Sequence, residues 1–174
     1  RGEQAPPRRF IEILKTIEVT DGDKRAALQP ADRFEVAFEI QFPTAVIGRQ
    51  AIDMAMDEQV FRNELADCRT FGFLHEVEAL RAIGLARGGS LENVVVIEND
   101  RVLNAEGLRR PQEFVRHKAL DAIGDLYVLG APVIGRFEGL RAGHAINNQL
   151  VRALLERPDA FRVRTFAEDP AQAV

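Results

Sequence analysis

The sequence predicts an α+β domain in which a sheet and a set of helices form two layers. Residues 34–42 alternate between apolar and polar side chains, which is typical of a strand with one buried face. Residues 111–129 place apolar side chains on most sides of a helical wheel, which indicates a long and largely buried helix. A chain of 174 residues with 46% hydrophobic residues suits one domain, with or without an insert, that needs no disulfides.

The other strands are identified by short runs of apolar and β-branched residues between turn residues. Strands are expected at residues 10–19, 24–29, 34–42, 47–56, 132–140 and 161–166. The segment Thr20–Asp23 (TDGD) favours a hairpin turn between the first two strands, and Pro43 ends the third.

Helical patterns are expected at residues 57–66, 111–129 and about 144–156. The first begins with acidic residues, which suit the positive end of a helix dipole. In the longest helix, Pro111 is expected in the first turn and Gly130 near the C-terminal cap.

Residues 68–98 are expected to form a separate β-α-β insert on the main domain. Its expected parts are an extended segment, a helix and a buried strand at residues 69–73, 75–83 and 94–97. Residues 1–8 have a linker-like composition and lack an initiator Met, so we expect them to precede a domain at 9–174 within a longer protein.

The composition argues against several classes of protein. Lys and Arg number 23 against 27 Asp and Glu, and the net charge of −4 argues against a broad nucleic-acid interface. No apolar stretch approaches the roughly 18 residues that a transmembrane helix needs. The single cysteine, Cys68, cannot form an internal disulfide, and a reducing, cytoplasmic location is expected.

A polar stripe follows one face of the longest predicted helix. With His117 at zero on a helical wheel, Asp121 falls at about 40° and Asp125 at about 80°. Charged groups on a buried helix need a partner or a metal. A His and an Asp one turn apart can bind the same Zn²⁺, but they can equally form an ordinary i,i+4 pair.

A second candidate, His144, follows Gly143 and begins the next predicted helix. Its position is compatible with a capping or surface histidine. It is also compatible with an acid–base group that works beside Asp125, because histidine titrates near neutral pH.

These segments resemble the UDP-3-O-acyl-N-acetylglucosamine deacetylases of lipid A biosynthesis. Residues 113–126 (EFVRHKALDAIGDL) resemble the zinc-binding helix of that family, and residues 143–148 (GHAINN) are similar to its catalytic-histidine segment. The segments at 69–73 (RTFGF), 88–90 (GGS) and 101–104 (RVLN) also fit, in the family's order.

The resemblance implies a two-domain sandwich of two similar α+β halves, with helices packed between two sheets. This chain would be the second half, with an acyl-passage insert at about 68–98. The implied cofactor is Zn²⁺, with His117 and Asp121 as two of three ligands. The first half would supply the third ligand, a histidine, and the glutamate that acts as general base. This sequence has no Glu-His pair, since His75 precedes Glu76.

The resemblance also implies roles in amide hydrolysis for three further residues. His144, held as an imidazolium by Asp125, would stabilise the oxyanion and protonate the leaving amine. Thr70 resembles the hydroxyl donor to the oxyanion.

Substrate contacts follow from the same resemblance. Lys118 resembles a substrate-binding lysine, Phe42 an aromatic residue that stacks on the uracil, and Lys24 and Arg141 the cations that meet the diphosphate. An apolar passage for the acyl chain would be lined by Phe71, Phe73, Leu74, Val77, Ala86, Gly89, Leu91 and Val96. Plain core packing explains each of these apolar residues equally well.

A hypothesis from another class remains open. The chain could be a non-catalytic domain that binds a nucleotide-sugar or an acyl chain without turning it over. A Glu-His pair elsewhere in the protein would favour the deacetylase.

Overall fold

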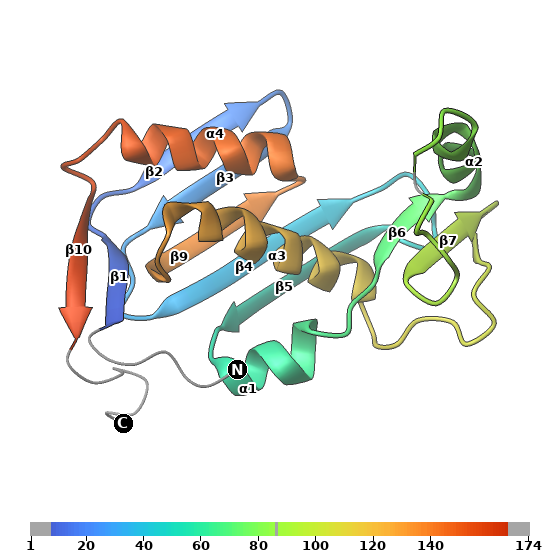
Figure 1. Cartoon of the computed structure of the whole chain (residues 1–174), viewed down its shortest axis with the longest axis horizontal. Coiled ribbons are helices and arrows are strands. Elements are labelled where there is room, and N and C mark those ends of the chain that lie inside the picture. The colour runs from blue at the N-terminus through green and yellow to red at the C-terminus, as the bar shows by residue number, and fades with distance from the viewer. Residues whose placement is uncertain (1–7, 86, 167–174) are drawn as a thin grey trace.

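The computed structural model describes residues 8–85 and 87–166, and its main body is one large sheet covered by two helices (Figure 1). The sheet has seven strands. Strands β10, β1, β9, β3 and β2 are successive neighbours, β4 also pairs with β9, and β5 pairs with β4. The strands are β1 (Arg8–Ile13), β2 (Ile17–Asp21), β3 (Lys24–Gln29), β4 (Phe34–Gln41), β5 (Arg49–Ala55), β9 (Val133–Leu140) and β10 (Phe161–Phe166).

Strand β9 is the centre of this sheet. It pairs in parallel with β4 and antiparallel with β3, and its first residues also pair in parallel with β1. Phe137 of β9 lies opposite Leu28 on one side and Val36 on the other, and all three are buried. At Gly139 an added Cβ would lie 2.7 Å from the Phe38 ring, so close packing of that ring excludes a side chain there.

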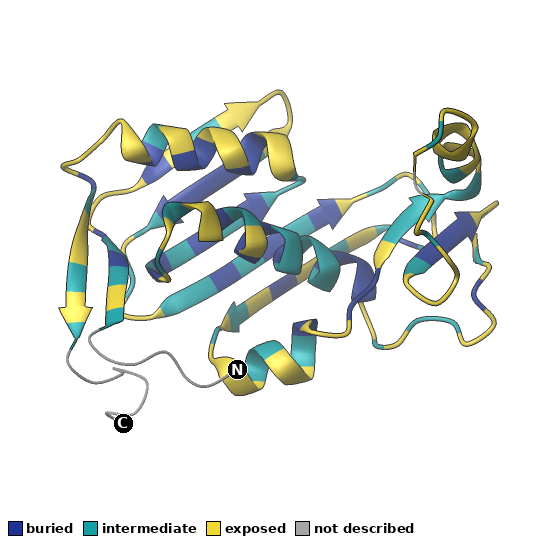
Figure 2. Cartoon of the chain, in the orientation of Figure 1, coloured by how far each residue is buried: buried dark blue, intermediate teal, exposed yellow. Residues whose placement is uncertain are grey.

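Two helices cover one face of the sheet (Figures 1 and 2). Helix α3 (Glu113–Leu126), extended by the 3₁₀ turn η2 (Tyr127–Leu129), packs on β4 and β5. Helix α4 (His144–Leu155) packs on β2 and β3 and lies beside α3. The two-layer α+β arrangement expected from the sequence is therefore present.

The opposite face of the sheet carries a row of ion pairs across neighbouring strands. Arg136 on β9 donates to Glu35 on β4, to Asp53 on β5 and to Glu138 at distances of 2.7–3.0 Å. Arg25 on β3 donates to Glu138 at 3.1 Å. These carboxylates raise the pKa of Arg136, with the hydrogen bond to Asp53 as the largest cause.

A smaller sheet lies at one end of the molecule (Figure 1). Its strands β6 (Thr70–Phe73) and β7 (Val94–Glu98) are parallel and joined through α2 (Leu74–Ala82), and β8 (Arg101–Val102) pairs antiparallel with β7. The β-α-β order expected for this region is present. Val95 and Ile97 of β7 belong to the same apolar core as the large sheet, so the two sheets are packed as one body.

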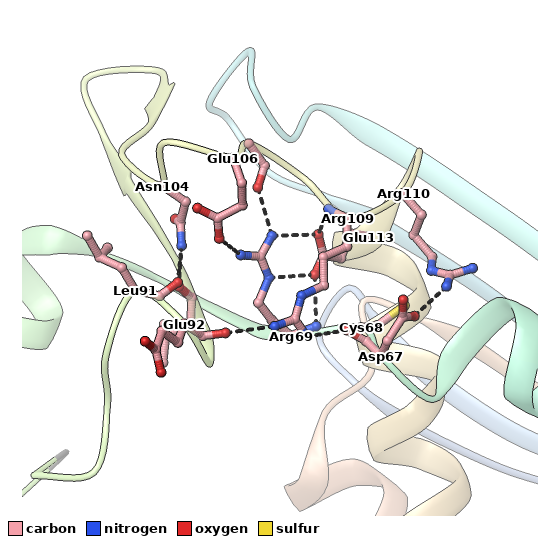
Figure 3. A network of polar contacts seen from close by, with 12 residues as sticks. Asp67, Cys68, Arg69, Leu91, Glu92, Asn104, Glu106, Arg109, Arg110 and Glu113 are labelled. Carbon is pink, nitrogen blue, oxygen red and sulfur yellow. Dashed lines mark hydrogen bonds and ion pairs between the residues drawn. The ribbon is translucent and has the colours of Figure 1, made fainter.

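A buried ion pair joins the smaller sheet to the start of α3 (Figure 3). Glu113 accepts from the backbone N–H and Nε of Arg69, both at 2.9 Å, from its Nη2 at 3.1 Å, and from the backbone N–H of Arg109 at 2.7 Å. Burial alone would raise the pKa of Glu113, but these hydrogen bonds outweigh burial and lower it. The charge pair is thus buried with its polar atoms paired.

The structure corrects two boundaries expected from the sequence and adds one strand. Residues 10–19 form two strands, because the N–H groups of Leu14 and Lys15 both donate to the carbonyl of Ala160 and interrupt the strand. Pro111 lies outside α3, because Gln112 has a left-handed backbone with φ of 56°. Strand β8 was not expected.

The remaining elements agree with the sequence expectation. Residues 57–66 are helical, as α1 (Glu58–Val60) followed by the π-helical turn η1 (Phe61–Leu65), with Asp57 capping the N-terminus. Gly130 ends η2 in the left-handed conformation. Within the described residues, no helix is long and apolar enough to span a bilayer.

We predict that Glu113→Ala destabilises the chain by about 3–5 kcal/mol, because it leaves Arg69 buried without its main partner. Urea unfolding measures this change. Glu106→Ala is the matched control, since Glu106 pairs with the same guanidinium but exposes 54% of its side chain, and it should cost about 1 kcal/mol or less. Equal losses in the two variants would contradict the prediction.

The lowered pKa of Glu113 gives the sign of the pH dependence. A carboxyl with a depressed folded-state pKa stabilises the protein above its ordinary value of 4.5, and this contribution disappears as the pH falls through the folded-state pKa. Stability curves in acid should therefore fall less steeply for Glu113→Gln than for the unchanged chain.

Candidate active site

The polar stripe on α3 forms as the wheel predicts. His117 Nε2 lies 3.2 Å from Asp121 Oδ1, and Lys118 Nζ donates to Asp121 Oδ2 at 2.9 Å. The His117 and Asp121 side chains are only 14% and 16% exposed. The opposite side of α3 is fixed in the core by Val115, Ala119, Ala122 and Leu126, so the stripe faces away from the sheet.

The imidazole of His117 lies in a desolvated environment. Burial lowers the pKa of His117 below its ordinary value, although the nearby Asp121 carboxylate raises it in part. A neutral imidazole is the form that binds a metal. The backbone of Cys68 lies beside the ring, and burial raises the pKa of the Cys68 thiol to about 11. This cysteine is therefore a protonated packing residue at neutral pH.

The third member of the stripe, Asp125, connects α3 to α4. Its two carboxylate oxygens lie 2.9 and 3.0 Å from Nδ1 of His144, the first residue of α4. Asn147, one turn further along α4, donates from Nδ2 to Asp125 Oδ2 at 2.9 Å. The sequence reasoning had linked Asp125 with His144, and the structure brings these two side chains together.

The other nitrogen of His144 completes a compact group of side chains. Its Nε2 lies 3.9 Å from Asp121 Oδ2, while the imidazole is 64% exposed. One ring nitrogen thus meets Asp125, and the other faces the Asp121 carboxylate that His117 also approaches. An acid–base group and a His–Asp pair are therefore held at one place on the helix layer.

This His–Asp pair offers a metal two donors of suitable chemistry, because zinc binds imidazole nitrogen and carboxylate oxygen. Among the described residues, no group of three or more His, Cys, Asp or Glu side chains is arranged to hold a metal. Structural and catalytic zinc sites take three or four protein ligands. The pair fits zinc as part of a ligand set that needs at least one further protein donor.

A pocket of about 340 Å³ lies next to the stripe, between the tip of the β2–β3 hairpin, the end of β4 and α3. Its lining includes Lys24, Phe42, Lys118 and Arg141, four residues that were expected to contact the substrate. The structure therefore brings these four together. The pocket also contains Asp23, whose carboxylate forms an ion pair with the Arg141 guanidinium.

The backbone at Arg141 is strained. Arg141 has a φ of 48°, in the left-handed region that residues other than glycine rarely adopt. It is fixed there by its N–H, which donates to the Glu39 carbonyl at 2.8 Å. This turn carries the chain from β9 into α4, and it puts Arg141 in the pocket three residues before His144.

Comparison with known proteins identifies the family. The model of the UDP-3-O-acyl N-acetylglycosamine deacetylases (LpxC) matches residues 1–156. The chain belongs to this deacetylase family.

Curated relatives agree with this assignment. Proteins named UDP-3-O-acyl-N-acetylglucosamine deacetylase are 76% identical over 174 residues in Phenylobacterium zucineum, 51% over 168 residues in Acidithiobacillus ferrooxidans and 46% over 169 residues in Teredinibacter turnerae. The matches cover 100%, 95% and 96% of this chain but only 59%, 55% and 56% of the relatives. The chain thus spans a little over half the length of these deacetylases.

The residues expected to form the acyl passage of the deacetylase are only partly gathered. Phe71 and Phe73 pack against Phe42, with ring centroids 5.6 and 6.5 Å apart. Phe73 and Leu74 line a cavity of about 360 Å³ beside β7. The other residues differ in burial: Val77 and Gly89 are half-buried, Leu91 is exposed and Val96 is buried, while Ala86 lies outside the described residues.

Thr70, the expected oxyanion donor, is the exposed first residue of β6 and follows the buried Arg69. Sequence reasoning missed two residues of the site, Asn147 and Asp23. Asn147 occupies a helical position where the apolar stripe of α4 predicts an apolar residue, and that mismatch was the available signal. Asp23 was read only as part of the turn, because its partner lies 118 residues away.

Proposed function

We propose that this chain forms part of a zinc-dependent deacetylase that hydrolyses the N-acetyl group of UDP-3-O-acyl-N-acetylglucosamine, the committed step of lipid A biosynthesis. The observation that carries the proposal is that two histidine–carboxylate pairs lie side by side on helices α3 and α4. The His117–Asp121 pair and the Asp125–His144 pair share one surface, next to a pocket with three cationic side chains.

The zinc ligands in this chain are His117 and Asp121. When bound, zinc polarises the acetyl carbonyl and lowers the pKa of a bound water. Burial of His117 and its position beside Asp121 support this choice. The contacts of the Asp125 oxygens with His144 and Asn147 support giving Asp125 a different role from the two ligands.

The chain's own residues then supply binding and proton transfer. Asp125 holds Nδ1 of His144, which leaves Nε2 free to carry the proton that passes to the leaving amine. Lys24 and Arg141 bind the diphosphate through their charges, Phe42 stacks on the uracil, and Lys118 contacts the substrate beside the zinc ligands. Thr70 donates its hydroxyl to the developing oxyanion.

The remaining machinery comes from a first half of the same enzyme, which supplies the third zinc ligand, a histidine, and a general-base glutamate. Two observations support this. The relatives are longer than this chain, and the described residues lack a third ligand. The outer side of α3 and η2 also exposes Gly124, Tyr127 and Val128, which suits a second layer packed on the helices as in a two-domain sandwich.

The insert at about 68–98 would guide the acyl chain. Support comes from the small sheet itself, where α2 has no buried residue and Leu80, Ile83, Leu85 and Leu91 are exposed. Apolar side chains that stay exposed in this region suit a flexible acyl ligand.

A second candidate function is a domain that binds a nucleotide-sugar without turning it over. The incomplete ligand set favours it for this chain in isolation, because the cationic pocket lies wholly within the chain while the metal site does not.

The zinc assignment predicts that His117→Ala lowers bound zinc far more than His144→Ala does in the assembled enzyme. The reason is that His144 is engaged with Asp125 and is largely exposed. Zinc content per protein, determined by mass spectrometry of the metal, measures the difference. Similar zinc contents in the two variants and the unchanged enzyme would disprove the ligand assignment.

This chain alone should show no deacetylase turnover. Two protein ligands hold zinc weakly, since zinc sites normally use three or more, and the general base is absent. Product release from UDP-3-O-acyl-N-acetylglucosamine measures activity, and addition of a separately purified first half should restore it. Robust turnover by the chain alone, free of full-length enzyme, would overturn the proposed division of the site.

The pocket predicts that Asp23→Asn strengthens the binding of UDP. The Asp23 carboxylate forms an ion pair with the Arg141 guanidinium, so a diphosphate that binds Arg141 has to displace Asp23. Removal of an exposed ion pair of this kind should lower the Kd for UDP by about two- to fivefold, as measured by calorimetry. Two controls should show no change: Asp21→Asn, at the end of β2 and outside the pocket lining, and uridine, which lacks phosphate. Weaker UDP binding by Asp23→Asn would contradict the prediction.

A further inference from the structure

We propose that Asn147 is a positioning residue, which fixes the Asp125 carboxylate so that His144 is held in one orientation and one tautomer. This inference rests on the proposed function, because that function gives His144 its role in proton transfer. The starting observation is a polar side chain in the interior of the helix layer. Asn147 has no exposed surface, and the other buried residues around it on the same face of α4, Ile146, Leu150 and Val151, are all apolar.

The side-chain amide of Asn147 is only partly hydrogen-bonded, which makes its burial costly. Its Nδ2 donates to Asp125 Oδ2 at 2.9 Å, while its Oδ1 is buried and has no hydrogen-bond partner among the described residues. A buried polar atom without a partner destabilises a protein, so packing alone would favour an apolar residue of similar size here. The bond to Asp125 is therefore the one polar contact of this amide that offsets the cost.

That contact restricts the carboxylate that holds His144. Asp125 lies on α3 and meets two groups of α4, Nδ1 of His144 and Nδ2 of Asn147, which are one helical turn apart. With Oδ2 held by Asn147, the carboxylate cannot rotate freely about its Cβ–Cγ bond. It then keeps its acceptor directed at Nδ1, which selects the tautomer with the proton on Nδ1 whenever the imidazole is neutral.

The consequence reaches the other ring nitrogen. The imidazole of His144 is 64% exposed, so packing alone does not hold it. Its Nε2 lies 3.9 Å from Asp121 Oδ2 because the ring is held at Nδ1. Asn147 thus acts through Asp125 and His144 and does not itself contact the reacting atoms.

The test compares Asn147→Leu with Asn148→Leu. Leucine matches asparagine in shape and removes both the bond to Asp125 and the unpaired oxygen. Asn148 is the matched control, because it is exposed and its amide donates to the backbone carbonyl of His144, at 2.8 Å, and not to Asp125. Nitrogen-15 NMR of histidine-labelled chain reports the tautomer of His144, and urea unfolding reports stability.

In Asn147→Leu we expect the share of the Nδ1–H tautomer of His144 to fall, with a urea midpoint no lower than that of the unchanged chain. In the assembled enzyme, kcat should fall about tenfold or more with KM unchanged, within the range found for residues that support a catalytic group indirectly. Asn148→Leu should leave the tautomer and kcat unchanged. A purely structural role would lower the midpoint and leave the tautomer as it is.

An unchanged tautomer in Asn147→Leu, or an equal change in Asn148→Leu, would overturn the inference. If the leucine variant does not fold, Asn147→Ala gives the same comparison of tautomers, because it also removes the amide. The tautomer is read from the chain without substrate. An assembled enzyme that never turns over the substrate would therefore disprove the proposed function, while the NMR result would still decide the role of Asn147.

Discussion

The buried Arg69–Glu113 pair is the interaction on which the arrangement of this molecule depends. A single carboxylate accepts from three donors of Arg69, where β6 begins, and from the backbone of Arg109, in the loop before α3. Glu113 is also the first residue of α3. The pair therefore fixes where the longest helix begins relative to the small sheet. Because His117 follows one turn later, it also fixes the position of the polar stripe relative to Thr70.

Helix α3 carries core contacts and the polar stripe on opposite sides. Its apolar side is packed on β4 and β5, which leaves the helix little freedom to rotate or slide. The stripe on its other side is consequently rigid before any ligand binds. Helix α4 adds His144 and Asn147 from one turn, so the site is built on two packed helices rather than on loops.

Periodicity predicted the parts of the fold that depend on local sequence. The strand at 34–42 and the helical face shared by His117, Asp121 and Asp125 follow from alternation and from the helical wheel. The break after β1 could not be predicted in this way, because it depends on the carbonyl of Ala160, far along the chain. Asn147 stands out in the sequence only as a polar residue in an apolar stripe, and its partner could not be predicted because Asp125 lies on another helix.

The row of charges on the outer face of the sheet has a consequence for how the strands find their partners. Side chains alternate between the two faces of a strand, so a shift of β9 by one residue would turn Arg136 and Glu138 toward the helices and Phe137 toward water. Both errors are penalised at once, by burial of charge and by exposure of an aromatic ring. In β9, where Gly135 and Gly139 contribute no side chains, the charges therefore help to exclude misaligned sheets during folding.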